Sequence, residues 1–178
     1  ILMTTRFSSA FFAIIKPLGV GYCHMLPTLD KPNRDMALLY PRFAEMVNSA
    51  LAECHAAGLP MEVFEGWRGP ERQTYLYAQG RTRSGAILTK AVAWQSAHQL
   101  GLAVDLASKV DGQWSWHFPI DKVRKIFEKH GMQSLAPFEN CHYQYMNGLN
   151  VTAAVALMKA SGLQRVWIEI EAASKNKE

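Results

Sequence analysis

The chain has 178 residues and a mass of 20.0 kDa, and its 19 basic and 15 acidic side chains leave a formal net charge of +4. A composition with 49% hydrophobic and 19% charged residues excludes a disordered or fibrous chain. Cys23, Cys54 and Cys141 form no CxxC zinc pattern and allow at most one disulfide, which excludes a disulfide-framed miniprotein. The charge excess is too small to indicate a nucleic-acid partner, but it is compatible with an enzyme that acts on an anionic surface.

The beginning of the chain carries only weak targeting signals. The longest early apolar stretch, residues 10–15, is broken by Lys16 and Pro17 and is far shorter than the roughly 18–20 residues that a membrane span needs. We therefore predict no membrane span. Clear patterning begins only after Met25, so we expect residues 1–25 to be a poorly ordered leader or vector-derived segment. A short export signal is the alternative.

Helical and strand-like patterns alternate from there on. Apolar residues recur at helical spacing over 43–54, between Pro41 and Gly58, which predicts an amphipathic helix. Residues 61–65 alternate like a short strand, and a second helix is expected over 70–79.

The second half of the chain continues this alternation after a long segment, residues 81–95, that has no clear period and is expected to be a functional loop. The elements predicted after that loop are a buried strand over 101–107, a helix over 119–130, short strands near 132–135 and over 141–145, and a last helix over 151–160. The pattern predicts an α+β fold, with a small antiparallel sheet flanked by helices. We expect one domain over 26–165, followed by a C-terminal extension and charged tail over 166–178.

Residues 96–105, SAHQLGLAVD, carry the clearest chemical signal. His98 and Asp105 are too far apart on a continuous helix or strand to bind one metal ion. A fold-back at Gly101, where a positive φ costs little, would bring the imidazole and the carboxylate together. A carboxylate in an apolar strand is itself unusual, because burial of an unpaired charge is expensive. Spacing alone leaves open that Asp105 caps a loop and that His98 lies at the surface.

Two further groups fit the same chemistry. Glu139 and His142, three residues apart at the entrance to a strand, can point into one cleft, where His142 would be a third ligand and Glu139 would deprotonate a bound water. Arg68, in a strand-to-helix turn, could bind a carboxylate or stabilise an oxyanion. Each residue taken singly also fits a structural role, as a loop carboxylate, a half-buried histidine or a surface ion pair.

Taken together, the segments EGWRGPERQ, GRTRSG, SAHQLGLAVD and ENCH resemble, in this order, the VanY-like D,D-carboxypeptidases and the L-alanyl-D-glutamate endopeptidases of phage endolysins. These enzymes belong to the wider lysostaphin, D-Ala-D-Ala and hedgehog group of zinc proteins. The family pattern is an aromatic–Arg turn followed by a Gln, then S-x-H-x-x-G-x-A-x-D, then an acidic residue three before a His. The resemblance covers about residues 43–145.

This resemblance implies a hedgehog/D-Ala-D-Ala-peptidase-like fold and a zinc ion, Zn2+, bound by His98, Asp105 and His142. It also implies that Glu139 is the general base and later the general acid, and that Arg68 steadies the substrate or the oxyanion. These roles are expectations that depend on the family.

The resemblance implies roles for two more residues and leaves one question open. Ser96 would touch the carboxylate or carbonyl of the substrate, and Gln73 would brace the turn that carries Arg68. Endopeptidase members often have Asp where this chain has Glu139, so the choice between endopeptidase and carboxypeptidase stays open.

Other reactive or aromatic residues are expected to be structural. Strand alternation directs Cys141 to the opposite face from His142, which argues against a thiol nucleophile or a fourth ligand. Trp114 and Trp116 would share one face of a strand and are expected to line the core rather than the cleft.

The resulting hypothesis is a monomeric zinc peptidase that hydrolyses the stem peptide of bacterial peptidoglycan, at the L-Ala–D-Glu bond. A D-Ala-D-Ala carboxypeptidase is one alternative, and a non-catalytic zinc-binding module of the same fold is an alternative from another class. The enzyme would be phage- or bacterium-encoded and would act in the periplasm or cell wall, by an export route that the sequence does not reveal. The loop residues Arg81, Arg83 and Lys90 would border the cleft and meet carboxylates of the stem.

Overall fold

The computed structural model describes residues 29–135 and 137–175, so the expectation for residues 1–25 lies outside the described part of the chain. The α-helices are α1 (Pro41–Ala56), α2 (Pro70–Ala78), α3 (Ile120–Lys129), α4 (Val151–Ser161) and α5 (Leu163–Lys175). The short 3-10 helices are η1 (Met36–Leu38) and η2 (Ala97–Leu100). The strands are β1 (Met61–Glu65), β2 (Ala103–Val110), β3 (Gln113–Ser115), β4 (Gln133–Leu135) and β5 (Glu139–Gln144).

Strand β2 organises the sheet. The strand order is β1-β2-β5-β4, and β3 pairs with the second half of β2; all the pairings are antiparallel. Asp105 of β2 pairs with Glu65 of β1 on one side and with His142 of β5 on the other. The sheet therefore brings three ionisable residues from distant parts of the sequence into one row, and the predicted α+β class is confirmed.

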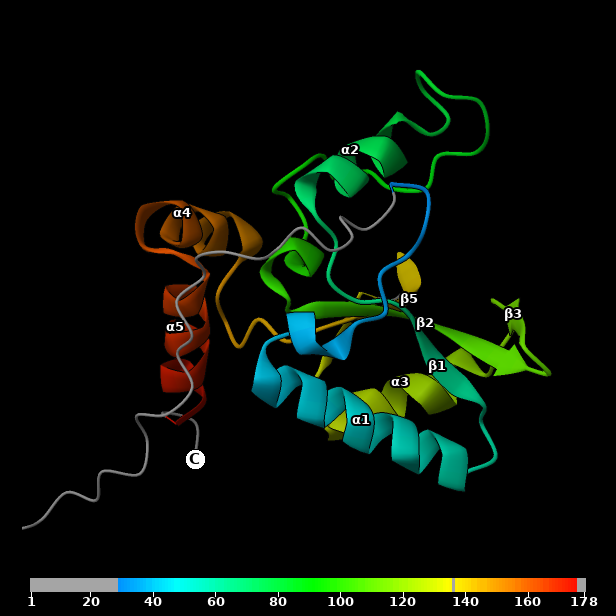
Figure 1. Ribbon diagram of the computed structural model, residues 1–178. Helices are drawn as coiled ribbons and strands as arrows, with labels where there is room; N and C mark the ends of the chain where they lie inside the picture. The colour runs from blue at the N-terminus through cyan, green and yellow to red at the C-terminus, as the bar shows by residue number, and fades with distance from the viewer. Residues whose placement is uncertain (1–28, 136, 176–178) are drawn as a thin grey trace, which may run out of the picture.

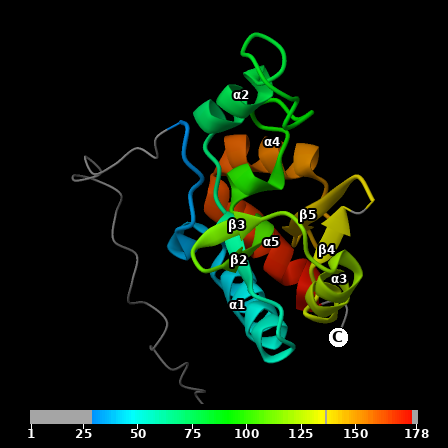
Figure 2. The same ribbon diagram turned by 90° about the vertical axis from the view of Figure 1, so that its right-hand side faces the viewer.

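Helices cover the sheet unequally. Figure 1 shows α1 and α3 on one face, with α2 and the long loop after it above the other face. Helices α4 and α5 pack against each other at one end of the sheet, and α4 also contacts η2 (Figure 2). None of the described helices is both long enough and apolar enough to cross a bilayer.

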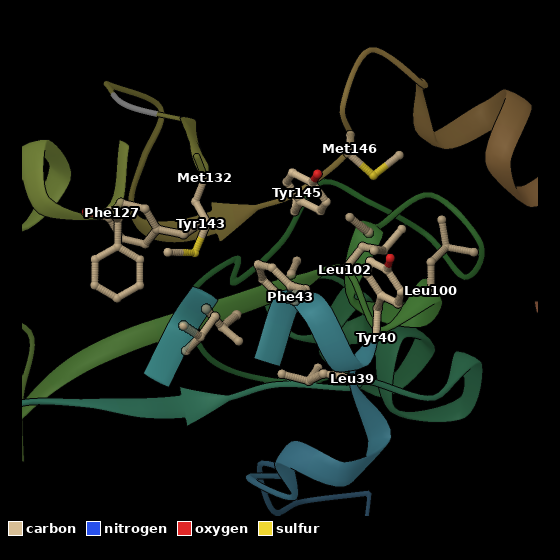
Figure 3. Packing of buried hydrophobic residues seen from close by; sticks show 14 of the residues in the cluster. Leu39, Tyr40, Phe43, Leu100, Leu102, Phe127, Met132, Tyr143, Tyr145 and Met146 are labelled. Atoms are coloured by element: carbon tan, nitrogen blue, oxygen red, sulfur yellow. The ribbon is translucent and has the colours of Figure 1, made fainter. Parts of the chain in front are cut away.

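The core lies mainly between α1, α3 and the sheet. Phe43 of α1 is fully buried, and Phe127 of α3 packs on Tyr143 of β5 with ring centroids 4.5 Å apart. Figure 3 follows this core from Phe127 and Tyr143 at one end to Leu100 and Leu102 at the other. Burial of an aromatic side chain of this size contributes roughly 1.5–3 kcal/mol to stability. The core thus supports the sheet from the side opposite α2.

The structure differs from the sequence-based expectation at two elements. The sequence allows a strand around Trp114 and Trp116 but gives no bounds for β3, because its three residues are too few to show a period. Only one helix was expected after residue 145, whereas the structure has α4 and then α5, in which Val166 and Ile170 are buried four residues apart. Charged residues on the exposed side of α5 obscured this spacing in the sequence.

Candidate metal centre and active-site cleft

Helix η2 fixes the position of His98. The Ser96 hydroxyl accepts a hydrogen bond from the His98 backbone N–H at 3.4 Å, and the Gln99 side chain accepts one from the Ser96 N–H at 3.3 Å. The helix ends at Gly101, where φ is 67° and the chain turns back into β2. This reversal brings His98 over Asp105, as the sequence analysis predicts. A Cβ atom at Gly101 would lie 2.8 Å from the Leu38 carbonyl oxygen, so the turn requires glycine.

Three side-chain donor atoms converge beside this turn. His98 Nε2, His142 Nδ1 and Asp105 Oδ1 lie 3.2 Å from one another in all three pairs. Both histidines are buried, with 1% and 5% of their surfaces exposed. The structure therefore brings together the three residues that the sequence predicts as metal ligands, and among the described residues they form the one group with this composition and spacing.

The outer hydrogen bonds of the histidines decide where their protons lie. His98 Nδ1 is 2.7 Å from the Gly66 carbonyl oxygen, which can only accept, so the proton is on Nδ1. His142 Nε2 donates in the same way to Gln144 Oε1 at 3.2 Å. With these outer protons in place, a neutral ring offers the lone pair of its inner nitrogen beside Asp105 Oδ1, as metal binding requires; without a metal ion, protonation of the ring turns the same nitrogen into a donor to Asp105 Oδ1.

Three such acceptors in mutual contact are well placed to share a cation. Zinc with nitrogen and oxygen ligands has bonds of about 2.0–2.1 Å, and tetrahedral geometry then separates neighbouring ligand atoms by about 3.3–3.4 Å. The observed separation of 3.2 Å is close to that value. The residues present therefore fit a zinc ion with two histidines and one carboxylate.

The second oxygen of Asp105 is held by Arg68. Arg68 Nη2 donates to Asp105 Oδ2 at 2.7 Å, which leaves Oδ1 for the donor triangle. Burial would raise the pKa of Asp105, but the charges of His98 and Arg68 and the hydrogen bonds from both histidines hold this pKa well below its usual value. The carboxylate is therefore ionised, as a metal ligand must be.

Sequence reasoning missed Glu65, which holds Arg68 in place. Arg68 Nε and Nη2 donate to Glu65 Oε2 at 3.0 and 2.7 Å, and Arg72 Nε donates to Glu65 Oε1. Burial would lower the pKa of Arg68, but the charges of Asp105 and Glu65 raise it. Glu65 lies on the inward side of β1 with only 2% of its surface exposed. A charged residue on the apolar side of an alternating strand was the available signal.

Gln73 connects Arg68 to the long loop. Its Oε1 accepts from Arg68 Nη1 at 3.2 Å, and its Nε2 donates to the Ala91 carbonyl at 2.7 Å. Four of the five N–H groups of Arg68 thus bond to Glu65, Asp105 and Gln73 within the described residues. One N–H on Nη1 is left for a group in the cleft.

Glu139 lies beside the donor triangle without belonging to it. Its Oε2 is 3.7 Å from His142 Nδ1, and its side chain is 51% exposed. It precedes His142 by three residues on β5, where the strand enters the sheet. Glu139 is therefore a carboxylate close to the candidate metal centre and open to solvent.

The candidate metal centre lies in a cleft of about 890 Å³. Helix α2 and the loop after it contribute Tyr75 and Leu88, the sheet side contributes Phe64 and Trp116, and Arg68 and Ser96 lie near the donors. Trp116 thus lines the cleft and is 50% exposed, so its expected place in the core is wrong. It follows the last paired residue of β3, where alternation no longer fixes the direction of a side chain.

The basic residues of the long loop are not among those that line the cleft. The Arg81 guanidinium stacks over Tyr77 and the Arg83 guanidinium stacks over Tyr75, each 3.8 Å from the ring centroid. Arg81 also donates to the Thr89 carbonyl at 3.2 Å. These two arginines therefore hold the loop against α2.

Cys141 lines the cleft, although strand alternation predicted that it would face away from it. The pairing of β4 with β5 shifts register between Ser134 and Leu135, which interrupts the alternation. Burial raises the pKa of the Cys141 thiol to about 12. The thiol is therefore protonated at neutral pH and unsuited to nucleophilic attack.

Comparison with known proteins gives a family and several relatives. A sequence profile of the VanY family, described as D-alanyl-D-alanine carboxypeptidase, matches residues 37–136, more than half of the chain. The peptidoglycan L-alanyl-D-glutamate endopeptidase CwlK of Bacillus subtilis (strain 168) is 36% identical over 84 residues, which are 47% of this chain and 50% of CwlK. The chain therefore spans about half the length of this curated relative.

Two solved structures have similar folds at low sequence identity. The L-Ala D-Glu endopeptidase ChiX of Serratia marcescens is 19% identical, with a TM-score of 0.45 over 66% of this chain and 87% of ChiX. A mutant of the vancomycin-resistance D,D-pentapeptidase VanY, in complex with Zn(II), is 21% identical, with a TM-score of 0.48 over 70% of this chain and 81% of that one.

Proposed function

This chain belongs to the VanY family of D-alanyl-D-alanine carboxypeptidases, and from that premise we propose that it is a zinc peptidase acting on the stem peptide of bacterial peptidoglycan. The bond that it cuts is L-Ala–D-Glu, and its place of action is the cell wall. The observation that carries the proposal is the triangle of three donor atoms at 3.2 Å, with a solvent-accessible carboxylate beside it. The choice of bond is supported by the similarity to CwlK.

The proposed ligands are His98, Asp105 and His142, and a zinc ion bound there supplies Lewis-acid activation of a water and of the scissile carbonyl. Glu139, with Oε2 3.7 Å from His142 Nδ1, takes the proton of the attacking water. The same carboxyl group then returns the proton to the leaving amine.

Two further residues orient the substrate in this proposal. Arg68 uses its remaining Nη1 N–H to donate to the developing oxyanion or to a substrate carboxylate. Ser96 lines the cleft, and its hydroxyl hydrogen is free to be donated because its oxygen is the acceptor in the cap of η2. Gln73 acts indirectly, because it fixes Arg68 and the loop together.

A D-Ala-D-Ala carboxypeptidase is the second candidate. It is favoured by the description of the matching family and by Glu rather than Asp at position 139. A non-catalytic zinc-binding module is disfavoured, because such a module needs neither Glu139 nor the buried Arg68.

Mass spectrometry of digested muropeptides tests the proposal. Purified peptidoglycan is incubated with the zinc-loaded protein and, in parallel, with the Glu139→Gln variant. We expect new peptides that begin with D-Glu and glycans that retain only L-Ala, in the wild-type digest alone. Release of free D-Ala with the L-Ala–D-Glu bond intact would assign the second candidate. A protein that binds zinc and releases neither product would contradict the enzymatic proposal.

A further inference from the structure

An aromatic surface lies in the same cleft as the metal centre. Trp116, half exposed, packs against Phe64 with ring centroids 4.7 Å apart and an interplanar angle of 63°. Phe64 in turn contacts Trp114 edge-on at 5.3 Å. Phe64 and Trp116 both line the cleft that contains the three metal-binding candidates.

Two cationic side chains pack against the aromatic rings of this surface. The Arg34 guanidinium lies 4.7 Å from the Trp114 ring centroid and 5.2 Å from that of Phe64, and Lys109 Nζ lies 5.0 Å from the Trp114 centroid. Cation–π contacts of this kind stabilise an aromatic cluster. Trp116 therefore packs against a stabilised aromatic cluster, while half of its surface remains exposed to solvent. An aromatic ring that is kept exposed next to a reaction site indicates a binding surface.

The chemistry of the proposed substrate narrows what this surface binds. The stem peptide offers methyl groups and charged side chains, and none of these needs a flat apolar surface as large as an indole. The pyranose rings of the glycan strand, in contrast, present a broad face of C–H groups. We propose that Trp116, supported by Phe64, binds the sugar ring of the N-acetylmuramoyl residue that carries the stem. This inference rests on the proposed function and extends it from the peptide to the glycan.

The distance along the sheet from Trp116 to the candidate metal centre fits the binding of this sugar ring. Ser115, next to Trp116, pairs with Ser108, three residues beyond Asp105 on β2. At about 3.4 Å per residue, the surface begins roughly 10 Å from the metal centre. L-Ala is joined directly to the lactyl group of muramic acid, so the sugar lies about two residue lengths, roughly 7 Å, from the L-Ala carbonyl.

The same distances favour one bond over the other. The D-Ala–D-Ala bond lies at least three residues, roughly 10 Å, further from the sugar in an extended stem. A sugar bound at Trp116 would therefore place the L-Ala–D-Glu bond, and not D-Ala–D-Ala, at the metal centre. The aromatic surface thus acts as a specificity determinant for the position of the cut.

Paired substrates test the role of Trp116. The Trp116→Ala variant is compared with the wild type on a disaccharide-tetrapeptide and on the same tetrapeptide without sugar. We expect KM for the sugar-bearing substrate to rise about tenfold, with kcat and the cleavage of the free peptide unchanged, and Trp116→Phe to restore part of the affinity. The control is Ile168→Ala, which removes another exposed apolar side chain, on α5. An equal effect on both substrates, or no effect on either, would overturn the proposal.

A binding experiment separates this proposal from the proposed function. The disaccharide GlcNAc–MurNAc, without peptide, is titrated into the zinc-loaded Glu139→Gln variant, and the indole N–H signals of the five tryptophans are followed by NMR. We expect the Trp116 signal to shift and those of Trp94 and Trp167 to stay. A Trp116 shift in this variant, combined with a wild-type protein that leaves the L-Ala–D-Glu bond intact, would keep the sugar site and reject the proposed function. Cleavage of that bond without a Trp116 shift at millimolar sugar would reject the sugar site.

Discussion

Glu139 differs from the other carboxylates of the site in how freely it can exchange protons. Its side chain is 51% exposed, whereas those of Asp105 and Glu65 are 16% and 3% exposed and are bound to arginine. A general base must take a proton and release it again in each turnover, which requires a side chain that is not fixed in an ion pair. This difference supports the proposal that different carboxylates serve for metal binding and for proton transfer.

The Glu139→Gln variant separates these two roles. Because the amide cannot accept the water proton, we expect kcat to fall by roughly 10²–10⁴-fold, while zinc affinity stays within about threefold of the wild type. Turnover of muropeptides and a competitive zinc titration are the measurements. Glu45→Gln, an exposed carboxylate on α1, is the matched control. Unchanged turnover in Glu139→Gln would remove this residue from the mechanism.

Glu65 is the shared ionic partner of two buried arginine side chains. It accepts hydrogen bonds from Arg68 and Arg72, so Glu65→Gln removes the negative charge that these two buried guanidinium groups share and leaves Arg68 with Asp105 as its charged partner. Removal of one member of a buried ion pair costs about 3–5 kcal/mol, and loss of an outer-sphere partner typically weakens metal binding by about 10–100-fold.

We therefore expect Glu65→Gln to lower the free energy of unfolding of the metal-free protein by about 3 kcal/mol and to weaken zinc binding at least tenfold. Urea unfolding and zinc titration measure the two effects. Glu62→Gln, on the same strand with a 48% exposed side chain, should leave both the free energy of unfolding and the zinc affinity nearly unchanged. Equal effects of the two substitutions would show that Arg68 does not need Glu65.

The proposed metal ligands, and the contact of Gln73 with Arg68, could be predicted from the sequence, whereas the role of Glu65 could not. His98, Asp105 and His142 lie in short motifs whose spacing restricts what they can do. Glu65 gains its importance only because β1 pairs with β2 and places it opposite Asp105, a contact across 40 positions of the chain. The exposure of Trp116 likewise depends on the end of a strand that is too short to recognise.

At the scale of elements, the turn from η2 into β2 places His98 beside Asp105. Gly101 adopts φ 67° and lies against the Leu38 backbone, with the Tyr40 N–H donating to its carbonyl at 2.9 Å. An Ala there meets both left-handed strain, about 1–2 kcal/mol, and a steric clash at 2.8 Å.

We expect Gly101→Ala to destabilise the protein by more than about 2 kcal/mol and to weaken zinc binding, because His98 moves with the turn. Gly112→Ala is the matched control, since Gly112 has φ 80° but nothing within 4 Å of the added Cβ atom. The Gly112→Ala variant should be destabilised only by the backbone strain, and its zinc affinity should be unchanged. Denaturant unfolding with and without zinc compares the two. If Gly112→Ala proved as costly as Gly101→Ala, the contact with Leu38 would be unimportant.

Helix α5 is attached to the domain by an ionic contact with α1. Tyr40 and Arg42 both donate to the Glu171 carboxylate, Arg42 Nη1 at 3.0 Å. The hydrogen bond from Tyr40, together with the charge of Arg42, lowers the pKa of Glu171 despite partial burial. A carboxyl group with a lowered pKa in the folded state stabilises that state fully above its unfolded pKa, about 4.3, and the stabilisation is lost as the pH falls through the folded pKa.

The Glu171→Gln variant should therefore be less stable than the wild type at neutral pH, and the difference should shrink as the pH falls from about 5 to about 3. Unfolding by urea at a series of pH values measures this difference. Glu169→Gln serves as the control, because Glu169 pairs with Arg165 on its own helix. A difference that stays constant over this pH range would rule out the ionised contact as its source.

Elements with a clear period were predicted well, and those that depend on tertiary contacts were not. The apolar spacing of α1 and α3 survives in the structure because each has one buried face. Helix α5 buries only Val166 and Ile170, and Trp167 reaches over to donate to the Leu100 carbonyl at 2.9 Å. The apolar face of such a helix can be recognised only when the surface that it packs against is known.

At the scale of the whole molecule, the candidate metal centre joins segments that lie far apart in the sequence. Its donors come from η2, β2 and β5, and Asp105 and His142 are 37 residues apart in the chain. When both rings are neutral, three lone pairs meet at 3.2 Å and repel one another unless a cation lies between them. Metal binding should therefore stabilise the entire domain, and not only the cleft.

We expect complete chelation to abolish peptidase activity and to lower the thermal midpoint, and added zinc to restore both. A ligand at 100 times its dissociation constant contributes about 2.7 kcal/mol, which for a chain of this size corresponds to a shift of roughly 5–10 °C. Magnesium should not substitute, since it prefers six oxygen ligands. His142→Ala, which removes one donor, should show little zinc-dependent shift by calorimetry. Activity that survived complete metal removal would contradict the zinc mechanism, and a zinc shift of equal size in His142→Ala would place the bound ion elsewhere in the molecule.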